Sequence, residues 1–165
     1  MAGIVFLFGT FSGFAEELGA NVGEPGVFSY QAPKGWQITT SPVSRFKLAV
    51  DVTKNNFAAN LNVVRDEFPG PLEDYVAANK KALKASTFFQ NLQFSTEKAF
   101  TTAAGMKGMR LVARDTLNKA DLQQIFYFFA GPKNSKLVVT ATSLATDADH
   151  YAPIFDASVK TFVLK

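Results

Sequence analysis

Two runs of apolar residues, at 125–129 and 137–139, flank a short segment that contains Gly131 and Pro132. Gly and Pro favour a turn, so the segment 122–143 predicts two strands joined as a hairpin. Each run is apolar at every position, which is typical of a strand that is covered on both faces. We therefore expect this hairpin to lie in the middle of a sheet.

The C-terminal segment has apolar residues at the spacing of one helix face. The stripe consists of Tyr151, Ile154, Phe155, Ser158, Val159 and Phe162. Thr146 and Asp149 have the spacing of a capping box. Pro153 indicates that the helix begins near 149–152 or is kinked at the proline. This helix should cover one side of the sheet.

A second helix is predicted over 71–83, because Pro71 suits a first turn and Glu73 and Asp74 favour the N-terminal end of the helix dipole. Its buried stripe would consist of Leu72, Tyr75, Val76, Asn79 and Leu83. Phe88 and Phe89 follow it, and we expect them to fill the space under the helix.

Alternating apolar and polar residues at 27–30, 46–50, 57–64 and 92–100 predict half-buried antiparallel strands, and a further strand with Arg110 and Arg114 on one face follows. The two arginines are interpreted either as an anion-binding pair or as exposed strand positions that discourage edge pairing or bridge to acids, and the second interpretation is preferred.

The N-terminal residues 1–15 predict a secretory signal peptide, because an apolar run is followed by Gly13 and Ala15 at the positions of a cleavage site before Glu16. The basic segment that usually precedes such a run is missing, and we expect the true start to lie upstream. The alternative is an N-terminal strand or helix that packs on the domain. Residues 16–26 predict a flexible spacer, and residues 27–165 one folded domain.

A chain of 165 residues with 17 Phe can form one self-sufficient domain with an aromatic core. The net charge of +3 is small, so we expect no nucleic-acid partner. The cluster Lys80, Lys81 and Lys84 is interpreted as a solvated helix face, with a phosphate-binding patch as the alternative. The absence of Cys excludes a disulfide, a thiol nucleophile and a lipoprotein anchor.

The sequence assigns no catalytic, cofactor-binding or metal-binding residue and leaves the binding residues open. His150 lies beside Asp147 and Asp149, but a lone His at a helix start is more often exposed than a metal ligand or an acid–base group. Three further patterns lack the required spacing for chemistry. They are Ser12, the pair Gly105 and Gly108, and the adjacent acids Glu16 with Glu17 and Glu73 with Asp74. We therefore expect no enzymatic activity.

The stretches 28–36 (FSYQAPKGW), 56–64 (NFAANLNVV) and 157–162 (ASVKTF), together with the helix at 71–83, resemble the PsbP-like family. Its fold is shared with a Ran-binding nuclear transport factor and with exported bacterial proteins such as DcrB. The resemblance covers 27–164. It implies an α+β fold, an α-β-α sandwich around a central antiparallel sheet of about six to seven strands, and a non-enzymatic accessory or binding role. It does not imply a photosystem partner, since the plant protein uses a longer N-terminal extension and metal-linked histidines.

Two functions are consistent with these features. The first is an exported accessory protein, periplasmic or secreted from a bacterium, with no membrane span after processing, which binds another envelope protein through its surface. The second is a carrier of a small apolar ligand in a pocket around Trp36 and Tyr127. Whether those aromatic side chains fill the core or line a void discriminates the two, and 17 Phe favour filling.

Overall fold

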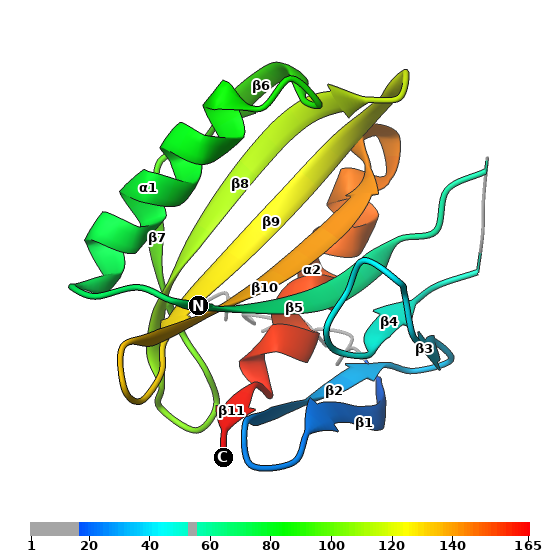
Figure 1. Cartoon of the computed structure of the whole chain (residues 1–165). Helices are drawn as coiled ribbons and strands as arrows, with labels where there is room; N and C mark the ends of the chain where they lie inside the picture. The colour runs from blue at the N-terminus through cyan, green and yellow to red at the C-terminus, as the bar shows by residue number, and fades with distance from the viewer. Residues whose placement is uncertain (1–16, 53–55) are drawn as a thin grey trace, which may run out of the picture.

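A computed structural model describes residues 17–52 and 56–165 of the chain. The predicted signal peptide, residues 1–15, lies outside this part. The described residues form three layers (Figure 1): helix α1 lies on one face of a large sheet, and helix α2 with a small second sheet lies on the other. The predicted α+β sandwich with a central antiparallel sheet is confirmed.

The large sheet has eight strands within the described residues, and all of its strand pairs are antiparallel. The strands are β3 (Gln37–Thr39), β4 (Leu48–Val50), β5 (Asn60–Glu67), β6 (Gln90–Phe94), β7 (Lys98–Thr101), β8 (Lys107–Leu117), β9 (Ala120–Ala130) and β10 (Ser135–Leu144). Their order is β3-β4-β5-β10-β9-β8-β6, and β7 also pairs with β8. The single strand expected at 92–100 is thus two strands, because the 11-residue β8 pairs with β6 along one part and with β7 along another.

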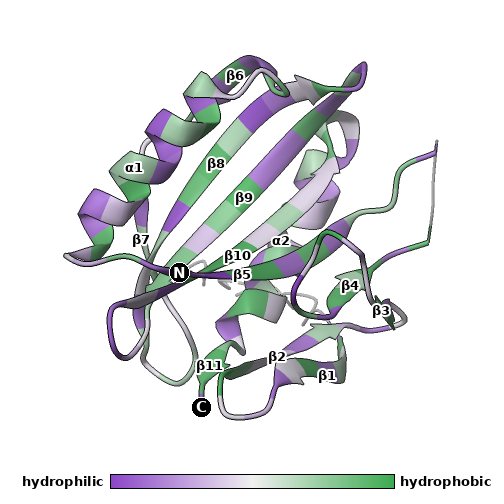
Figure 2. Cartoon of the chain, in the orientation of Figure 1, coloured by the Kyte–Doolittle hydropathy of each residue, from purple (hydrophilic) through white to green (hydrophobic). Residues whose placement is uncertain are grey.

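The hairpin of β9 and β10 lies mid-sheet, as its apolar runs predict. Residues 122–129 of β9 are all buried. Tyr127 and Phe129 face α2, whereas Phe126 and Phe128 face α1. Lys133 and Asn134 adopt positive φ in the connecting turn. Figure 2 shows bands of hydrophobic and hydrophilic residues that alternate along α1 and β8, where only part of the element is covered.

Helix α2 (Ala148–Lys160) follows a 3-10 turn, η1 (Ala145–Asp147), and buries Tyr151, Phe155 and Val159 as the stripe predicts. Its N-cap is Asp147, without a side-chain cap hydrogen bond. The capping box expected from Thr146 was therefore wrong: its hydroxyl donates to the Asp147 carboxylate instead.

The segment 16–26, expected to be a flexible spacer, contains strand β1 (Leu18–Glu24), which pairs with β2 (Phe28–Pro33). The pair is closed by a turn in which Gly26 has a φ of 71° and the amide of Val27 donates to the Glu24 carbonyl at 3.0 Å. Pro followed by Gly at the centre of a turn favours this geometry. Strand β11 (Val163–Leu164) pairs with the other edge of β2 and completes the small sheet.

The core between the large sheet and α2 is built mainly from aromatic rings. Phe162 stacks on Phe129 at 5.0 Å between ring centroids and on Phe28 at 5.5 Å, and so joins the end of α2 to both sheets. Each such ring pair adds about 0.5–1.5 kcal/mol beyond its buried area. The prediction of an aromatic core is confirmed.

Helix α1 (Leu72–Ala85) begins after Pro71, its N-cap, and buries Tyr75 and Val76 against β8, β9 and β10. The expectation that Phe88 fills the space under this helix was wrong, because its side chain is 76% exposed. Leu72 and Leu83, and not Phe88, pack against the edge of the buried cluster under α1. The segment after α1 therefore presents a large apolar ring to solvent.

Candidate functional site

The residues that the sequence singled out for chemistry do not converge. His150 is exposed at the start of α2, and its ring meets the ring of Tyr151 edge-on at 4.9 Å. Within residues 17–52 and 56–165, no group of three or more His, Cys, Asp or Glu side chains gathers as metal ligands would. Ser12 and Glu16 lie outside the described residues, and Glu17 pairs with Lys34 on the surface.

The two arginines of β8 have different surroundings. The Arg110 Nε donates to Asp156 of α2 at 2.8 Å, and the Arg114 Nε to Gln123 of β9 at 3.3 Å. Arg110 thus bridges to an acid, which is one of the roles expected for an exposed strand position. The two arginines therefore have different side-chain partners.

The glycines of the AAGMKGM segment have backbone roles. Gly105 has a φ of 81° in the turn before β8. Gly108 lies so close to β9 that a Cβ there would be 2.4 Å from the Phe128 carbonyl oxygen.

Trp36 and Tyr127 lie in a packed aromatic layer. The Trp36 ring meets Tyr151 and Phe155 edge-on at 6.2 and 6.1 Å, and Tyr127 is fully buried with its hydroxyl donating to Asp156 at 2.5 Å. Burial raises the pKa of Tyr127, and the negative charge of Asp156 adds to the shift. Neither ring lines the two hollows described below.

The first hollow has a volume of about 390 Å³ and lies between strand β5 and the loop that precedes β4. We call it the sheet groove. Its lining consists of Ser41, Val43, Ser44, Arg45, Leu48, Asn60, Asn62, Val63, Val64 and Arg65. The side chains of Asn60, Asn62 and Val64 alternate with the buried Leu61 and Val63, so they stand on the face that also carries α1.

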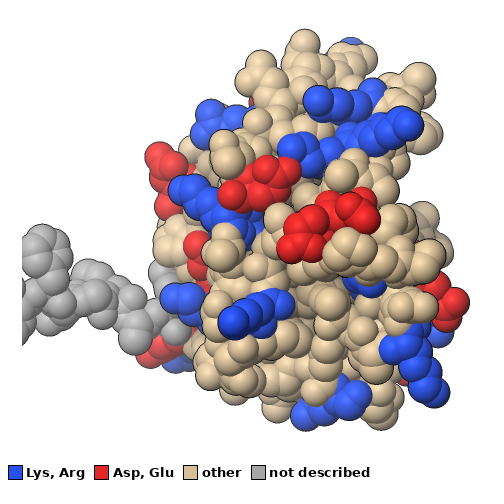
Figure 3. All heavy atoms as spheres, turned by 90° about the vertical axis from the view of Figure 1, so that its left-hand side faces the viewer, with Lys and Arg blue, Asp and Glu red and all other residues tan. Residues whose placement is uncertain are grey.

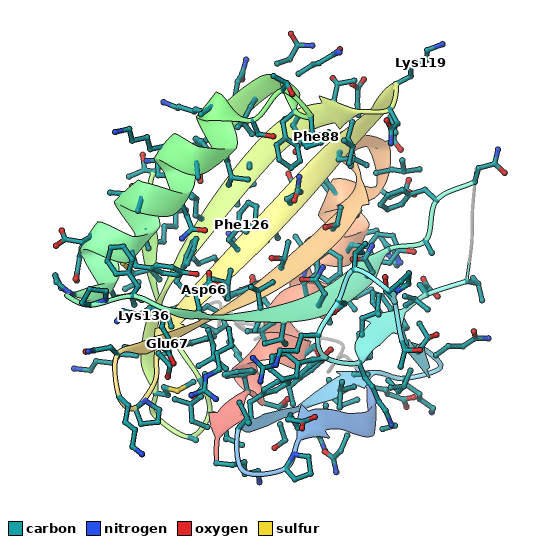
Figure 4. All side chains as sticks on the ribbon, viewed as in Figure 1. Asp66, Glu67, Phe88, Lys119, Phe126 and Lys136 are labelled. Carbon is teal, nitrogen blue, oxygen red and sulfur yellow. The ribbon has the colours of Figure 1, made fainter. Side chains whose placement is uncertain are left out.

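The sheet groove opens onto the part of this face that α1 leaves uncovered. Asn62 lies opposite Thr140 on β10, and Thr140 lies opposite Phe126 on β9. Figure 4 shows Phe126 and Phe88 on this same side of the large sheet, with Phe88 projecting from the segment after α1. The uncovered face is therefore bordered by the 41–45 loop on one side and by Phe88 on the other.

Exposed apolar side chains concentrate on this face. Among the described residues, four large hydrophobic side chains are exposed: Val43 at 94%, Val52 at 60%, Val64 at 46% and Phe88 at 76%. Val43 and Val64 line the sheet groove, and Phe88 borders the same face. Clustered exposed apolar residues with polar neighbours are typical of a binding surface.

The polar groups of the sheet groove are amides and hydroxyls. The Asn60 Nδ2 donates to the Ala58 carbonyl at 3.0 Å, and the Ser44 hydroxyl donates to the Phe46 carbonyl at 2.8 Å. The Asn62 Oδ1 is buried and accepts no hydrogen bond within the described residues. A buried acceptor without a donor lowers stability, and because this oxygen is buried, a molecule in the sheet groove does not contact it.

Sequence reasoning missed this site, because it considered chemistry-bearing residue types and treated Val64 only as the end of an alternating strand. The available signal was the break in alternation at Val63 and Val64, where two apolar residues stand side by side on opposite faces of β5.

The fold resembles those of solved structures at low sequence identity. LpqN of Mycobacterium tuberculosis, described as involved in cell envelope biogenesis, superposes with a TM-score of 0.68 at 14% identity over 88% of this chain and 90% of its own. The cyanobacterial PsbP of Synechocystis sp. PCC 6803 gives 0.62 at 14% over 96% and 99%. The Pseudomonas aeruginosa protein of unknown function PA94 gives 0.59 at 18% over 83% and 91%. The resemblance to the PsbP-like fold is confirmed.

No protein-family model and no curated protein matches the sequence. In the part of the chain that the structure describes, no helix is long and apolar enough to cross a membrane.

Proposed function

We propose that this protein is a non-enzymatic accessory protein of the cell envelope, which binds an extended segment of a partner protein in the sheet groove. The observation that carries the proposal is the placement of Val43, Val64 and Phe88, three exposed apolar side chains that lie on or beside the part of the sheet that α1 leaves uncovered. Leaving apolar side chains in water is unfavourable, and a partner that covers them gains about 25 cal/mol for each Å² of apolar surface removed from water.

The polar groups favour a polypeptide as the occupant. A peptide in extended form presents backbone N–H and C=O groups, and the amide and hydroxyl side chains that line the sheet groove are suited to pair with them. The Arg45 side chain is exposed at the rim, so an acidic residue in the bound segment would be favoured there.

The lining supports a role without catalysis. The Ser44 hydroxyl donates to the Phe46 carbonyl, and the Ser41 Oγ accepts from the amide of Val43 at 3.4 Å, so both hydroxyls hold the loop. The lining contains neither His nor a carboxylate that could activate them. A binding surface needs no such base.

The N-terminal sequence and one protein of similar fold support an envelope location. The apolar run in residues 1–15 predicts a signal peptide, and the LpqN protein of similar fold is described as acting in cell envelope biogenesis. We propose a periplasmic or secreted protein whose mature chain begins at Glu16. N-terminal sequencing of the protein from fractionated cells tests this: a mature chain that begins at Met1 in the cytosolic fraction would contradict export.

The binding proposal is tested by photo-crosslinking in cells that make the protein naturally. A benzophenone amino acid replaces Val43, Val64 or Phe88 in turn, and Val52 serves as the matched control because it is 60% exposed but does not line the sheet groove. One protein adduct of the same mass from positions 43, 64 and 88, absent at position 52, is expected. The Val64→Glu variant should abolish the adduct formed at Phe88, whereas Val52→Glu should leave it intact.

An adduct that forms equally from position 52, or no protein adduct from positions 43, 64 and 88, would overturn the proposal. A lipid or small-molecule adduct from the groove would favour the alternative function, a carrier of a small apolar ligand.

A further inference from the structure

A second hollow, of about 570 Å³, lies alongside helix α1 on the side away from the sheet groove, where the helix faces β7 and β8. We call it the helix hollow. Its lining consists of Glu73, Val76, Ala77, Lys80, Lys81, Lys84, Glu97 and Met109. This volume lies in the range of pockets that hold small molecules. Val76, only 2% exposed, and the half-buried Met109 give it an apolar floor.

The charge of Lys80 is already compensated. Its Nζ donates to the Glu97 Oε1 at 2.5 Å, and both side chains are more than two-thirds buried. The hydrogen bond from Lys80 lowers the pKa of Glu97, so this carboxyl stays ionised at neutral pH. The pair therefore contributes no net charge to the helix hollow.

Lys81 and Lys84 are exposed, and within residues 17–52 and 56–165 neither lies within 4.0 Å of a carboxylate. Lys84 lines the helix hollow, and its Nζ stands over the ring of Phe94 at 5.9 Å. Both lysines lie near the C-terminal end of α1, whose dipole contributes about half a negative charge. Two full positive charges exceed that contribution, so this end of the helix hollow is positive.

Figure 3, which views the molecule from the side of α1, shows positive and negative side chains interspersed. Glu73 lines the opposite end of the helix hollow from Lys84, since the two residues are about 16 Å apart along a helix with a rise of 1.5 Å per residue. Positive charge is thus confined to one end of the helix hollow. A polyanion would need a continuous row of basic side chains, so it does not fit this site. The site suits one anionic group.

We propose that the helix hollow binds an anionic amphiphile, with its carboxylate or phosphate head at Lys81 and Lys84 and its apolar chain on Val76, Ala77 and Met109. The head gains two charge-assisted contacts at exposed ammonium groups, and the chain gains contact with the apolar floor. The site is separate from the sheet groove, so binding at one can be lost without loss at the other.

Isothermal titration calorimetry with dodecyl phosphate and dodecanoate, each below its critical micelle concentration, tests the proposal. Two compounds serve as controls: dodecyl maltoside has the apolar chain without the negative charge, and inorganic phosphate has the negative charge without the chain. The double variant K81Q/K84Q removes the head contacts, and K47Q/K160Q removes the same total charge at two exposed lysines outside the hollow. We expect K81Q/K84Q to weaken binding of at least one anionic amphiphile about tenfold or more, and K47Q/K160Q to change it less than twofold.

The proposal would be overturned by equal binding to K81Q/K84Q and to the unchanged chain, by equal binding of dodecyl maltoside, or by no binding of either anionic amphiphile. Inorganic phosphate that binds as tightly as dodecyl phosphate would also overturn it, because the chain would then contribute nothing. The Ala77→Asp variant is a second check, since a carboxylate on the exposed floor should weaken the anionic amphiphile without changing the unfolding midpoint by more than a few tenths of a molar in urea.

Discussion

The Arg110 side chain of β8 donates from Nε to the Asp156 Oδ1 of α2 at 2.8 Å, across the layer between sheet and helix. The same carboxylate accepts from the Tyr127 hydroxyl at 2.5 Å. The Arg110 side chain is 19% exposed and the Asp156 side chain 35%. This three-residue network therefore fixes the position of α2 on the sheet with partly desolvated charges.

Removal of the acid should destabilise the fold. We expect Asp156→Ala to lower the free energy of unfolding by about 1.5–3 kcal/mol, because Arg110 and Tyr127 both lose a charged acceptor. Urea unfolding measures the loss. In a double-mutant cycle with Arg110→Leu, the two losses should be non-additive by at least about 0.5 kcal/mol. Simple additivity would show that the two side chains act independently.

A pH effect is expected at Asp115, which is 4% exposed, with its Oδ2 accepting from the Gln124 Nε2 at 2.7 Å and its Oδ1 unpartnered among the described residues. Burial raises the pKa of Asp115, and the hydrogen bond from Gln124 opposes the shift. The folded state therefore binds this proton more tightly than the unfolded state. The contribution of Asp115 to stability falls as pH rises from about 4, its unfolded pKa, through its folded pKa.

The variant Asp115→Asn should remove this dependence. Near pH 3.5 it should match the unchanged chain, and at pH 7 it should be more stable by about 1 kcal/mol, because no buried charge has to be accommodated. Thermal or urea unfolding at both pH values measures the difference. If Asp115→Asn is instead less stable than the unchanged chain at pH 7 but matches it at pH 3.5, the folded state stabilises the ionised carboxylate of Asp115.

Gly108 is expected to be intolerant of a side chain, since a Cβ would lie 2.4 Å from the Phe128 carbonyl oxygen and 2.6 Å from the Phe129 ring. The strands β8 and β9 would have to part at this point. Gly108→Ala should cost about 1–3 kcal/mol in urea unfolding. The exposed turn residue Ala104 offers a control, and Ala104→Ser should change stability by less than about 0.5 kcal/mol. Equal effects would mean that the sheet adjusts freely there.

The exposed Phe88 should contribute little to folding. Phe88→Ser is expected to change the free energy of unfolding by less than about 0.5 kcal/mol, because a ring that is 76% exposed loses few contacts. Phe128→Ser, at a ring that is 0% exposed, should cost at least about 3 kcal/mol and serves as the comparison. A large loss for Phe88→Ser in urea unfolding would identify a structural role and remove it from the proposed binding surface.

The elements with strong periodicity were predicted correctly from the sequence. The run at 125–129 identified a central strand, and the stripe through Tyr151 and Phe155 identified α2, because burial on a fixed period is recorded directly in residue type. The strand at 18–24 was not predicted, since Gly-rich segments usually form loops. The strand forms because it pairs with an edge of β2. This pairing is a tertiary contact that the local sequence does not encode.

The candidate site was less predictable than the fold. Phe88 was expected inside because Phe is usually buried, and only the three-dimensional path of the chain after α1 shows that its ring faces solvent. Val43 and Asn62 lie in different segments and meet through the pairing of β4 with β5. Lys80, Lys81 and Lys84 were recognised as one helix face, but the neighbouring Glu97 and Met109 come from other segments of the chain.

The strand order also has a consequence for the sequence of folding events. The hairpins β8–β9 and β9–β10 join neighbours through short turns, whereas β5 reaches β10 only after α1, β6, β7, β8 and β9 have intervened along the chain. Local pairs close at a lower entropic cost than distant ones. The β8–β9–β10 meander should therefore form first, and β3, β4 and β5 should join late and detach early. In a hydrogen-exchange experiment the amides of Asn60 and Asn62 would then lose their protection before those of β9. A molecule bound in the sheet groove would therefore slow the opening of the least stable edge of the large sheet.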